Sequence, residues 1–74
     1  MKAIVWSKDD CPYCVQAKNL LQLKGIQYEE RNITQGTWTK EQLLESVPNA
    51  RAVPQILIDD VLVGGFAELR KLLG

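Results

Sequence analysis

The sequence contains no histidine and only two cysteines, Cys11 and Cys14. A structural zinc site normally takes four nitrogen or sulfur ligands, and this chain supplies two thiolates at most. A zinc ion or an iron–sulfur cluster would therefore need ligands from a second chain or from an outside thiol. Two cysteines also make a poor disulfide framework for a secreted domain. These shortages favour redox chemistry, with a shared metal site or a structural disulfide as the alternatives.

The chain also lacks an excess of charge and a long apolar run. Nine basic residues balance nine acidic ones, so the net charge does not indicate binding to nucleic acid or to an anionic membrane. The apolar run near the start is too short for a signal peptide or a membrane span. We therefore expect a cytoplasmic protein, and we take a monomer as the default. Its 74 residues, 46% of them hydrophobic and without repeats or linkers, predict one domain over residues 1–74.

The segment Cys11-Pro12-Tyr13-Cys14 is the main chemical motif of the sequence. Proline is favoured at the first position of a helix, which makes Cys11 the N-cap residue. A Cys11 thiolate could then accept hydrogen bonds from the N–H groups of Tyr13 and Cys14, and the helix dipole would stabilise it. Both effects lower the pKa of a thiol from its free value of ~8.5. Cys14 should be more buried and more basic, so we expect Cys11 to attack and Cys14 to resolve.

The first half of the chain predicts a strand, a helix and a second strand. The apolar run 3–6 suits a central strand buried on both faces. The helix should cover residues 12 to about 24, after which Gly25 supplies a left-handed end. Ile26 and Tyr28 alternate with polar residues, as in a half-exposed strand, and such a unit implies parallel strands with a right-handed crossover. The buried stripe of the helix should comprise Cys14, Ala17, Leu20 and Leu21.

A short helix opens the second half. Thr39 and Gln42 fit a capping box, and Trp38 and Leu43 occupy the positions of a hydrophobic staple around it. Pro48 ends this helix. Its buried side should comprise Leu43, Leu44 and Val47.

A hairpin and a last helix complete the chain. The run Gln55–Ile58, which a proline precedes, should join Val61–Val63 through a tight turn at Asp59-Asp60. Gly64-Gly65 breaks the second strand, and Phe66–Leu73 predicts a helix. The order β-α-β-α-β-β-α indicates an α/β fold, with a mixed four-stranded sheet and three helices packed on it.

This order, with Cys-Pro-Tyr-Cys at the first strand–helix junction, resembles a glutaredoxin of the thioredoxin superfamily. The resemblance covers nearly the whole chain and implies the thioredoxin-like fold. The short length and the Gly-Gly-Phe segment are most similar to the compact bacterial and phage glutaredoxins. The matched features are Lys8 three residues before Cys11, the motif at 11–14, Val53-Pro54 and Gly64-Gly65.

The resemblance assigns roles at the cysteine end of a glutathione site. Cys11 matches the nucleophile, and Cys14 matches the resolving thiol. Lys8 matches a cation near the thiolate and near the glycyl carboxylate of glutathione. Tyr13 matches a residue that flanks the glutathione groove.

The resemblance also assigns roles along the rest of that groove. Val53 matches the residue whose backbone pairs with the glutathione peptide like an added strand. Pro54 matches the cis-proline of the family, beside the disulfide. Gly64 and Gly65 match the approach to the pocket for the γ-glutamyl group.

The chain departs from the family at two places. Ala52 stands where many members have threonine, directly before Val-Pro. The positions that hold the γ-glutamyl carboxylate are commonly a variable residue, then serine or threonine, then aspartate. Here they are Phe66, Ala67 and Glu68. We therefore expect glutathione binding to be weakened and not abolished.

The resemblance implies a glutathione-dependent thiol–disulfide oxidoreductase that reduces protein disulfides and glutathione mixed disulfides. It implies no bound cofactor and no metal, with glutathione as the reducing co-substrate and ribonucleotide reductase as a frequent protein substrate in the family. Two alternatives stay open. One is reduction by thioredoxin reductase, and the other is a dimer that holds an iron–sulfur cluster through Cys11 and glutathione. The proline of the motif disfavours cluster binding by family resemblance.

Overall fold

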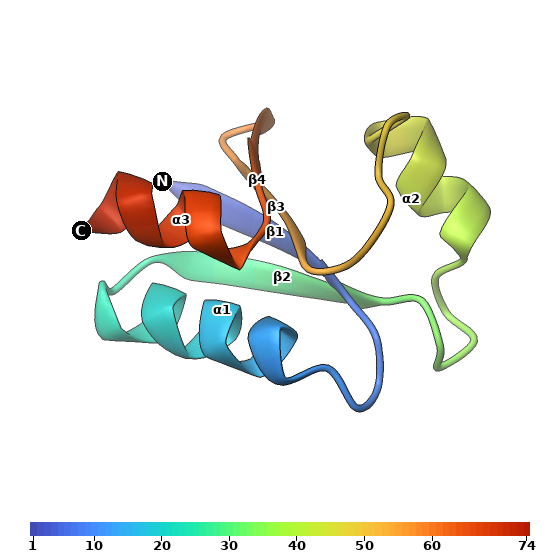
Figure 1. Cartoon of the computed structure of the whole chain (residues 1–74), viewed down its shortest axis with the longest axis horizontal. Helices are drawn as coiled ribbons and strands as arrows, with labels where there is room; N and C mark the ends of the chain where they lie inside the picture. Colours follow the sequence, from blue (N-terminus) through green and yellow to red (C-terminus); the bar gives the residue numbers. More distant parts are fainter.

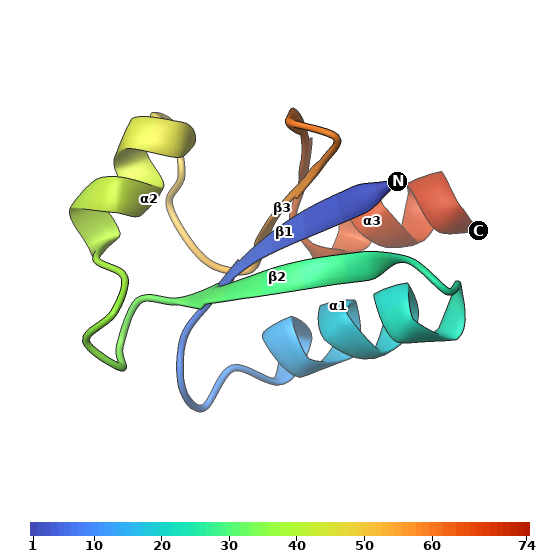
Figure 2. The same ribbon diagram turned by 180° about the vertical axis from the view of Figure 1, so that it is seen from behind.

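A mixed four-stranded sheet forms the centre of the computed structural model, which describes all residues 1–74, and helices cover both of its faces (Figures 1 and 2). The elements follow the expected order β-α-β-α-β-β-α. They are β1 (Lys2–Ser7), α1 (Pro12–Leu23), β2 (Gln27–Asn32), α2 (Lys40–Ser46), β3 (Gln55–Ile58), β4 (Val61–Gly64) and α3 (Phe66–Leu73). None of the helices combines the length and the apolar character needed to cross a membrane.

The strands lie in the order β2-β1-β3-β4, which places β1 in the interior of the sheet. β1 and β2 are parallel from the Lys2–Gln27 pair to the Ser7–Asn32 pair, as the strand–helix–strand pattern predicts. β3 is antiparallel to both β1 and β4. The carboxyl ends of β1 and β2 therefore lie together at one edge of the sheet, and the chain turns from that edge into α1. Such an edge is where α/β proteins usually bind ligands.

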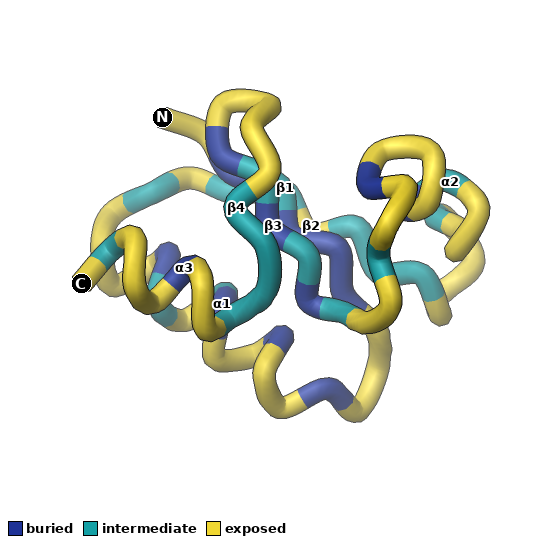
Figure 3. The backbone as a smooth tube through the Cα atoms, turned by 45° about the horizontal axis from the view of Figure 1, so that its top comes forward, coloured by how far each residue is buried: buried dark blue, intermediate teal, exposed yellow.

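The sheet separates two hydrophobic cores. Alternate residues of a strand face opposite sides, so Val5 and Trp6 of β1 belong to different cores. The larger core comprises Ala3, Val5, Ala17, Leu21, Ile56, Ile58 and Leu69, under α1 and α3. The smaller core comprises Trp6, Leu43 and Val47, between the sheet and α2. Figure 3 shows burial along the central strands, whereas most of α2 is exposed.

The start of α2 is built as the sequence predicts. Thr39 Oγ1 accepts a hydrogen bond from the Gln42 N–H at 3.1 Å, and Gln42 Oε1 accepts one from the Thr39 N–H at 2.8 Å. This reciprocal pair confirms the capping box. Trp38 packs against the core that contains Leu43, and its ring meets Trp6 edge to face with centroids 5.5 Å apart. The Arg31 guanidinium lies over the Trp38 ring at 4.3 Å.

The expected burial of Leu44 is wrong. Leu44 is 36% exposed, whereas Leu43 and Val47 are 3% and 4% exposed. A helix of only 7 residues meets the sheet along one i, i+4 stripe, and Leu44 lies beside that stripe. The ends of some helices and strands also differ slightly from those expected. β2 continues to Asn32 because its backbone pairs along the whole of β1, although its later side chains are polar and charged.

The hairpin between β3 and β4 turns at Asp59 and Asp60. Both residues have a positive φ, 49° and 67°, as a two-residue hairpin turn with matching twist requires. Asp59 Oδ1 also accepts a hydrogen bond from the Lys2 N–H at 3.0 Å. The predicted turn is therefore confirmed and is tied to the start of β1.

Candidate active site

Cys11 and Cys14 form a disulfide at the start of α1. Cys11 is the N-cap residue with extended backbone angles, φ −119° and ψ 96°, and Pro12 begins the helix. The Cys14 N–H donates to Cys11 Sγ at 3.2 Å. The predicted cap is thus confirmed for the Cys14 N–H, while the expected second bond from Tyr13 is absent. The motif folds this way because proline needs no N–H partner in the first turn.

The two sulfurs differ in access. Cys11 is 8% exposed and Cys14 is 1% exposed, as the position of Cys14 inside the first turn predicts. Cys11 Sγ lies 3.9 Å from the carbonyl oxygen of Val53, in the segment that leads into β3. An incoming sulfur therefore reaches Cys11 first, next to the backbone that leads into β3.

A groove of about 350 Å³ begins beside this segment and runs to the start of α3. The Val53–Pro54 peptide bond is cis, in agreement with the family resemblance. The side chains of Tyr13 and Phe66 stack with ring centroids 5.9 Å apart, which joins the first turns of α1 and α3. The lining residues are Tyr13, Ala52, Val53, Pro54, Gln55, Gly65, Phe66, Ala67 and Glu68.

The far end of the groove is the N-terminus of α3, where Gly65 is the N-cap residue. Glu68 Oε1 accepts a hydrogen bond from the Gly65 N–H at 2.9 Å. Gly64 has φ 122°, and a Cβ atom there would lie 3.0 Å from the same Glu68 oxygen. Because Gly65 has no side chain, it accepts no capping hydrogen bond in return. A carboxylate of the chain itself therefore already occupies part of this helix start.

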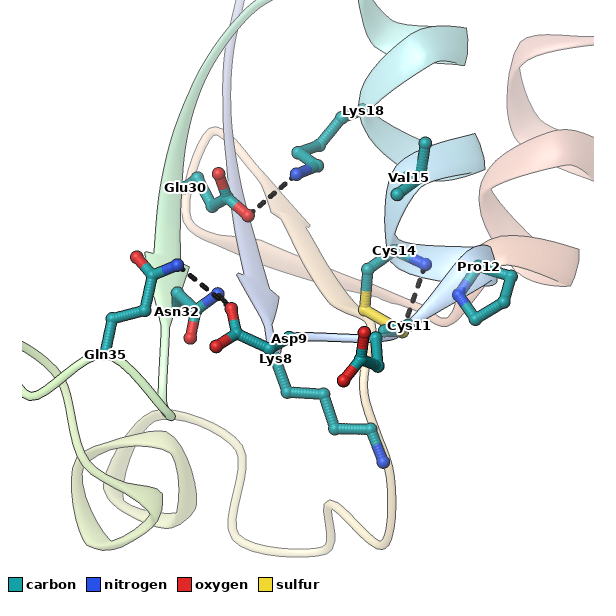
Figure 4. A pocket seen from close by; sticks show the side chains of 11 residues that line it. Lys8, Asp9, Cys11, Pro12, Cys14, Val15, Lys18, Glu30, Asn32 and Gln35 are labelled. Carbon is teal, nitrogen blue, oxygen red and sulfur yellow. Dashed lines mark hydrogen bonds and ion pairs between the residues drawn. A yellow bond between two sulfur atoms is a disulfide. The ribbon is translucent and has the colours of Figure 1, made fainter.

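A polar cavity of about 590 Å³ lies on the other side of the disulfide (Figure 4). Asp9 Oδ1 accepts hydrogen bonds from Asn32 Nδ2 at 3.1 Å and from Gln35 Nε2 at 2.9 Å. These bonds fix the carboxylate of Asp9 at the carboxyl end of β2. Lys8 also lines this cavity, but Figure 4 shows its amine turned away from the disulfide.

Glu30 is the second fixed carboxylate of this cavity. Its Oε2 atom accepts from Lys18 Nζ at 2.9 Å and from Ser7 Oγ at 2.7 Å. The hydrogen bond from Lys18 is the main cause that holds the pKa of Glu30 below its usual value, and desolvation by burial opposes it. The network joins β2 to α1 and β1.

The glutaredoxin family model matches residues 3–63 of this chain. The chain belongs to the glutaredoxin family. Glutaredoxin 1 of Rickettsia felis is 40% identical over 70 residues, which cover 93% of this chain and 69% of that protein. Glutaredoxins are thiol–disulfide oxidoreductases, and this member carries its redox pair at Cys11 and Cys14.

Solved structures agree with this assignment and with a thioredoxin-like fold. Reduced Escherichia coli glutaredoxin aligns with a TM-score of 0.80 and 30% identity, over 99% of this chain and 93% of that chain. A buckwheat glutaredoxin–glutathione complex aligns with a TM-score of 0.80 and 26% identity, over 93% of this chain and 64% of that chain.

This glutaredoxin gathers most of the predicted site residues around one groove. Tyr13, Val53, Pro54 and residues 65–68 line it, and Lys8 lies across the disulfide from it. The polar cavity is not predicted from the sequence. The position of Asn32 could have indicated it. Asn32 ends a strand that is parallel to β1, and the carboxyl ends of parallel strands usually border the ligand site. The other unpredicted lining residues include Lys18, Glu30 and Gln35.

Proposed function

We propose that this glutaredoxin is a glutathione-dependent reductase of protein disulfides and of glutathione mixed disulfides. The Cys11 thiolate attacks one sulfur of the substrate disulfide, forms a mixed disulfide and expels the first substrate thiolate. The Cys14 thiolate then attacks the Cys11 sulfur and expels the second. Two electrons pass to the substrate, the two thiol protons end on the substrate thiols, and the Cys11–Cys14 disulfide remains.

Two glutathione molecules restore the dithiol. The first thiolate attacks the Cys11 sulfur, which forms a glutathione mixed disulfide and frees Cys14. The second attacks the glutathione sulfur of that mixed disulfide and releases oxidised glutathione and the Cys11 thiolate. Atoms and electrons balance, because two thiols become one disulfide in each half of the cycle.

The observation that carries this proposal is the groove that leads from Cys11 past Val53 to the start of α3. The backbone of Val53 would pair with the glutathione peptide. The N–H groups of the first turn of α3 would bind the γ-glutamyl carboxylate, with help from the helix dipole. Lys8 would attract the glycyl carboxylate. The glutathione complex of the buckwheat relative supports this assignment.

We place the reaction in the cytoplasm, where glutathione keeps thiols reduced. The protein would act as a monomer on disulfide-containing proteins, and ribonucleotide reductase is our first candidate substrate by family resemblance. No metal and no bound cofactor takes part in this scheme.

A second electron donor, thioredoxin reductase, is favoured by two features of the groove. Glu68 already holds the Gly65 N–H, and Ala67 has no hydroxyl to offer a ligand. Both features weaken the end of the groove that would bind glutathione. They leave the dithiol itself unaffected, so a protein reductant could supply the electrons.

A coupled NADPH assay with a protein disulfide as the final acceptor separates the two donors. One arm contains glutathione and glutathione reductase, and the parallel arm contains thioredoxin reductase alone. We expect faster NADPH consumption in the glutathione arm. Turnover in the thioredoxin reductase arm alone would reject glutathione dependence and favour the second donor.

The Cys14→Ser variant tests the roles of the two thiols. It should still release glutathione from a mixed disulfide, because that cycle needs only Cys11. With a protein disulfide it should stop as a covalent adduct, which mass spectrometry of the unreduced protein detects. Full turnover of protein disulfides by this variant would reject the resolving role of Cys14.

A further inference from the structure

A second groove, of about 210 Å³, lies between α2 and the segment that leads to Val53. Its rim carries three cations, Lys8, Lys40 and Arg51. Its floor is apolar and includes Leu44, whose exposure the sequence did not predict. The lining residues are Lys8, Ile33, Lys40, Leu43, Leu44, Ala50, Arg51, Ala52 and Val53. We call this surface the cationic groove.

The three rim cations have no partner in the chain. The two ion pairs of the structure join Lys18 to Glu30 and Arg31 to Glu29, and neither involves a rim residue. No acidic residue lines the groove, although α2 itself carries acidic side chains elsewhere. A chain with zero net charge thus concentrates unpaired positive charge over an apolar floor, directly beside the Val53 carbonyl that Cys11 Sγ approaches.

The polar cavity on the β2 side of the disulfide has three acidic lining residues, Asp9, Asp10 and Glu30, and two basic ones. The basic ones are Lys18, which is paired with Glu30, and Lys8, which also lines the cationic groove. Asp9 and Asp10 line the polar cavity there, and the Asp9 carboxylate is held by neutral amides and not by a cation. An acidic segment would therefore be attracted to the side of α2 and repelled from the side of β2. The two surfaces beside the disulfide therefore attract or repel an approaching substrate segment according to its charge.

We propose that the cationic groove docks a segment of the protein substrate that carries an acidic side chain and an apolar side chain beside the reactive cysteine. Its volume is below the roughly 300–1,000 Å³ of small-molecule pockets, which favours a side chain over a whole small ligand. The acidic group would pair with Lys40 and Arg51, and the apolar group would cover Leu44. This docking rests on the proposed thiol–disulfide activity. The groove shares Lys8 and Val53 with the proposed glutathione site, but Lys40, Leu44 and Arg51 lie outside that site.

Short single-cysteine peptides, each blocked as a mixed disulfide with 2-mercaptoethanol, test the proposal. The peptides carry Leu-Glu or Leu-Lys beside the cysteine, with the pair placed before it in one series and after it in the other. The rate of thiol release by the dithiol protein is measured at low and at high salt. In one series we expect the acidic peptide to react roughly three- to tenfold faster, with the advantage shrinking in high salt. Equal rates in both series would overturn the proposal.

Charge-reversal variants locate the effect. Arg51→Glu and Lys40→Glu should each slow the acidic peptide and speed the basic one. Lys24→Glu changes the net charge equally at the exposed end of α1, far from the groove, and should leave the ratio unchanged. Bis(2-hydroxyethyl) disulfide, a neutral substrate, should react equally with all four proteins. An equal change of the ratio in Lys24→Glu would mean that net charge alone selects the peptide and would reject the docking groove.

The apolar floor has its own test. Leu44→Ser should slow the Leu-Glu peptide several-fold and leave a Gly-Glu peptide unaffected, because only the first buries a side chain on Leu44. Leu44 is partly exposed, so the variant should fold. The same loss with both peptides would show that Leu44 does not contact the substrate.

Discussion

At the scale of single residues, the disulfide joins two sulfurs with different surroundings. Cys11 caps α1 and borders a groove, whereas Cys14 lies inside the first turn and is almost fully buried. Because the cap depends on the backbone around Pro12, we expect its geometry to remain when the disulfide is reduced. A Cys11 thiolate would then accept the Cys14 N–H and face the positive end of the helix dipole.

The reduced protein should therefore be alkylated first at Cys11. We expect the rate against pH to rise well below the free-thiol value of ~8.5. The Cys14→Ser variant should keep this early rise, and Cys11→Ser should lose it. Iodoacetamide labelling followed by mass spectrometry measures both. An inflection near the free-thiol value in the parent protein would contradict the stabilising effect of the cap.

Glu68 is one of the groove residues that depart from the pattern given by the family resemblance. Its carboxylate accepts the Gly65 N–H at 2.9 Å and covers Gly64. A bound γ-glutamyl carboxylate would compete with it for donors at the same helix start. Ala67 offers no hydroxyl to compensate.

The double variant Ala67→Thr with Glu68→Asp should lower the KM for glutathione several-fold. Threonine adds a hydroxyl at the helix start, and the shorter aspartate withdraws from the Gly65 N–H. A hydroxyl of this kind is worth about 1 kcal/mol, and 1.4 kcal/mol is about a factor of ten in affinity. The rate with dithiothreitol is the control and should hardly change. An equal gain with both reductants would show that the effect is not on the glutathione pocket.

At the scale of elements, α2 depends on its cap more than the other helices do. It has 7 residues, and Leu43 is its one buried residue. An isolated helix of this length is unstable in water, so the two bonds between Thr39 and Gln42 contribute directly to its formation.

Thr39→Ala should destabilise the protein by about 1 kcal/mol, or roughly 4–8 °C in Tm for a domain of this size. The loss follows because the Gln42 N–H is left without its acceptor. Thermal unfolding by circular dichroism measures it, with Thr37→Ala in the preceding loop as the matched control. A Tm equal to that of the control would show that the capping box contributes nothing.

Elements with a strong local signal were predicted from the sequence. Pro12, the Thr39–Gln42 box and the Asp59-Asp60 turn each act within a few residues, so their effect can be read along the chain. The exposure of Leu44 could not be read this way, because it depends on how a short helix meets a sheet formed by distant strands. The full length of β2 depends on its pairing with β1 in the same manner.

The same distinction between local signals and contacts of distant segments applies to the site. Cys11, Cys14 and most of the groove residues were predicted from motif and family resemblance, and their arrangement in space follows from the shared fold. Ala52 and Gln55 also line the groove and were not predicted as site residues. The cationic groove and the polar cavity were not predicted. Each combines residues from three or more segments of the chain. No local sequence pattern indicates that Lys8, Lys40 and Arg51 lie close together.

At the scale of the whole molecule, one partly exposed carboxylate connects three elements through its hydrogen bonds. Glu30 of β2 accepts from Lys18 of α1 and from Ser7 of β1. The bond from Lys18 lowers the pKa of Glu30 in the folded state. A lowered pKa stabilises the fold above the unfolded value, and this stabilisation is lost as the pH falls through the folded value.

The Glu30→Gln variant should be less stable than the parent at neutral pH, because the ion pair with Lys18 is lost. The difference should shrink as the pH falls from the usual glutamate value of 4.5 through the lowered pKa of Glu30. Urea unfolding at several pH values measures it. Glu45→Gln on the exposed side of α2 is the control and should show no such slope. A constant gap between variant and parent at all pH values would contradict the ion-pair explanation.

The division of the molecule into two cores has a consequence for its motions. α1 contributes two buried residues, Ala17 and Leu21, to the larger core, whereas α2 contributes Leu43 alone to the smaller one. Local opening costs less free energy where fewer apolar contacts must break. In native-state hydrogen exchange, the amides of α2 should exchange faster than those of α1. One wall of the cationic groove would then open and close while the disulfide stays in place, and proteins of different shape could be admitted to the same sulfur.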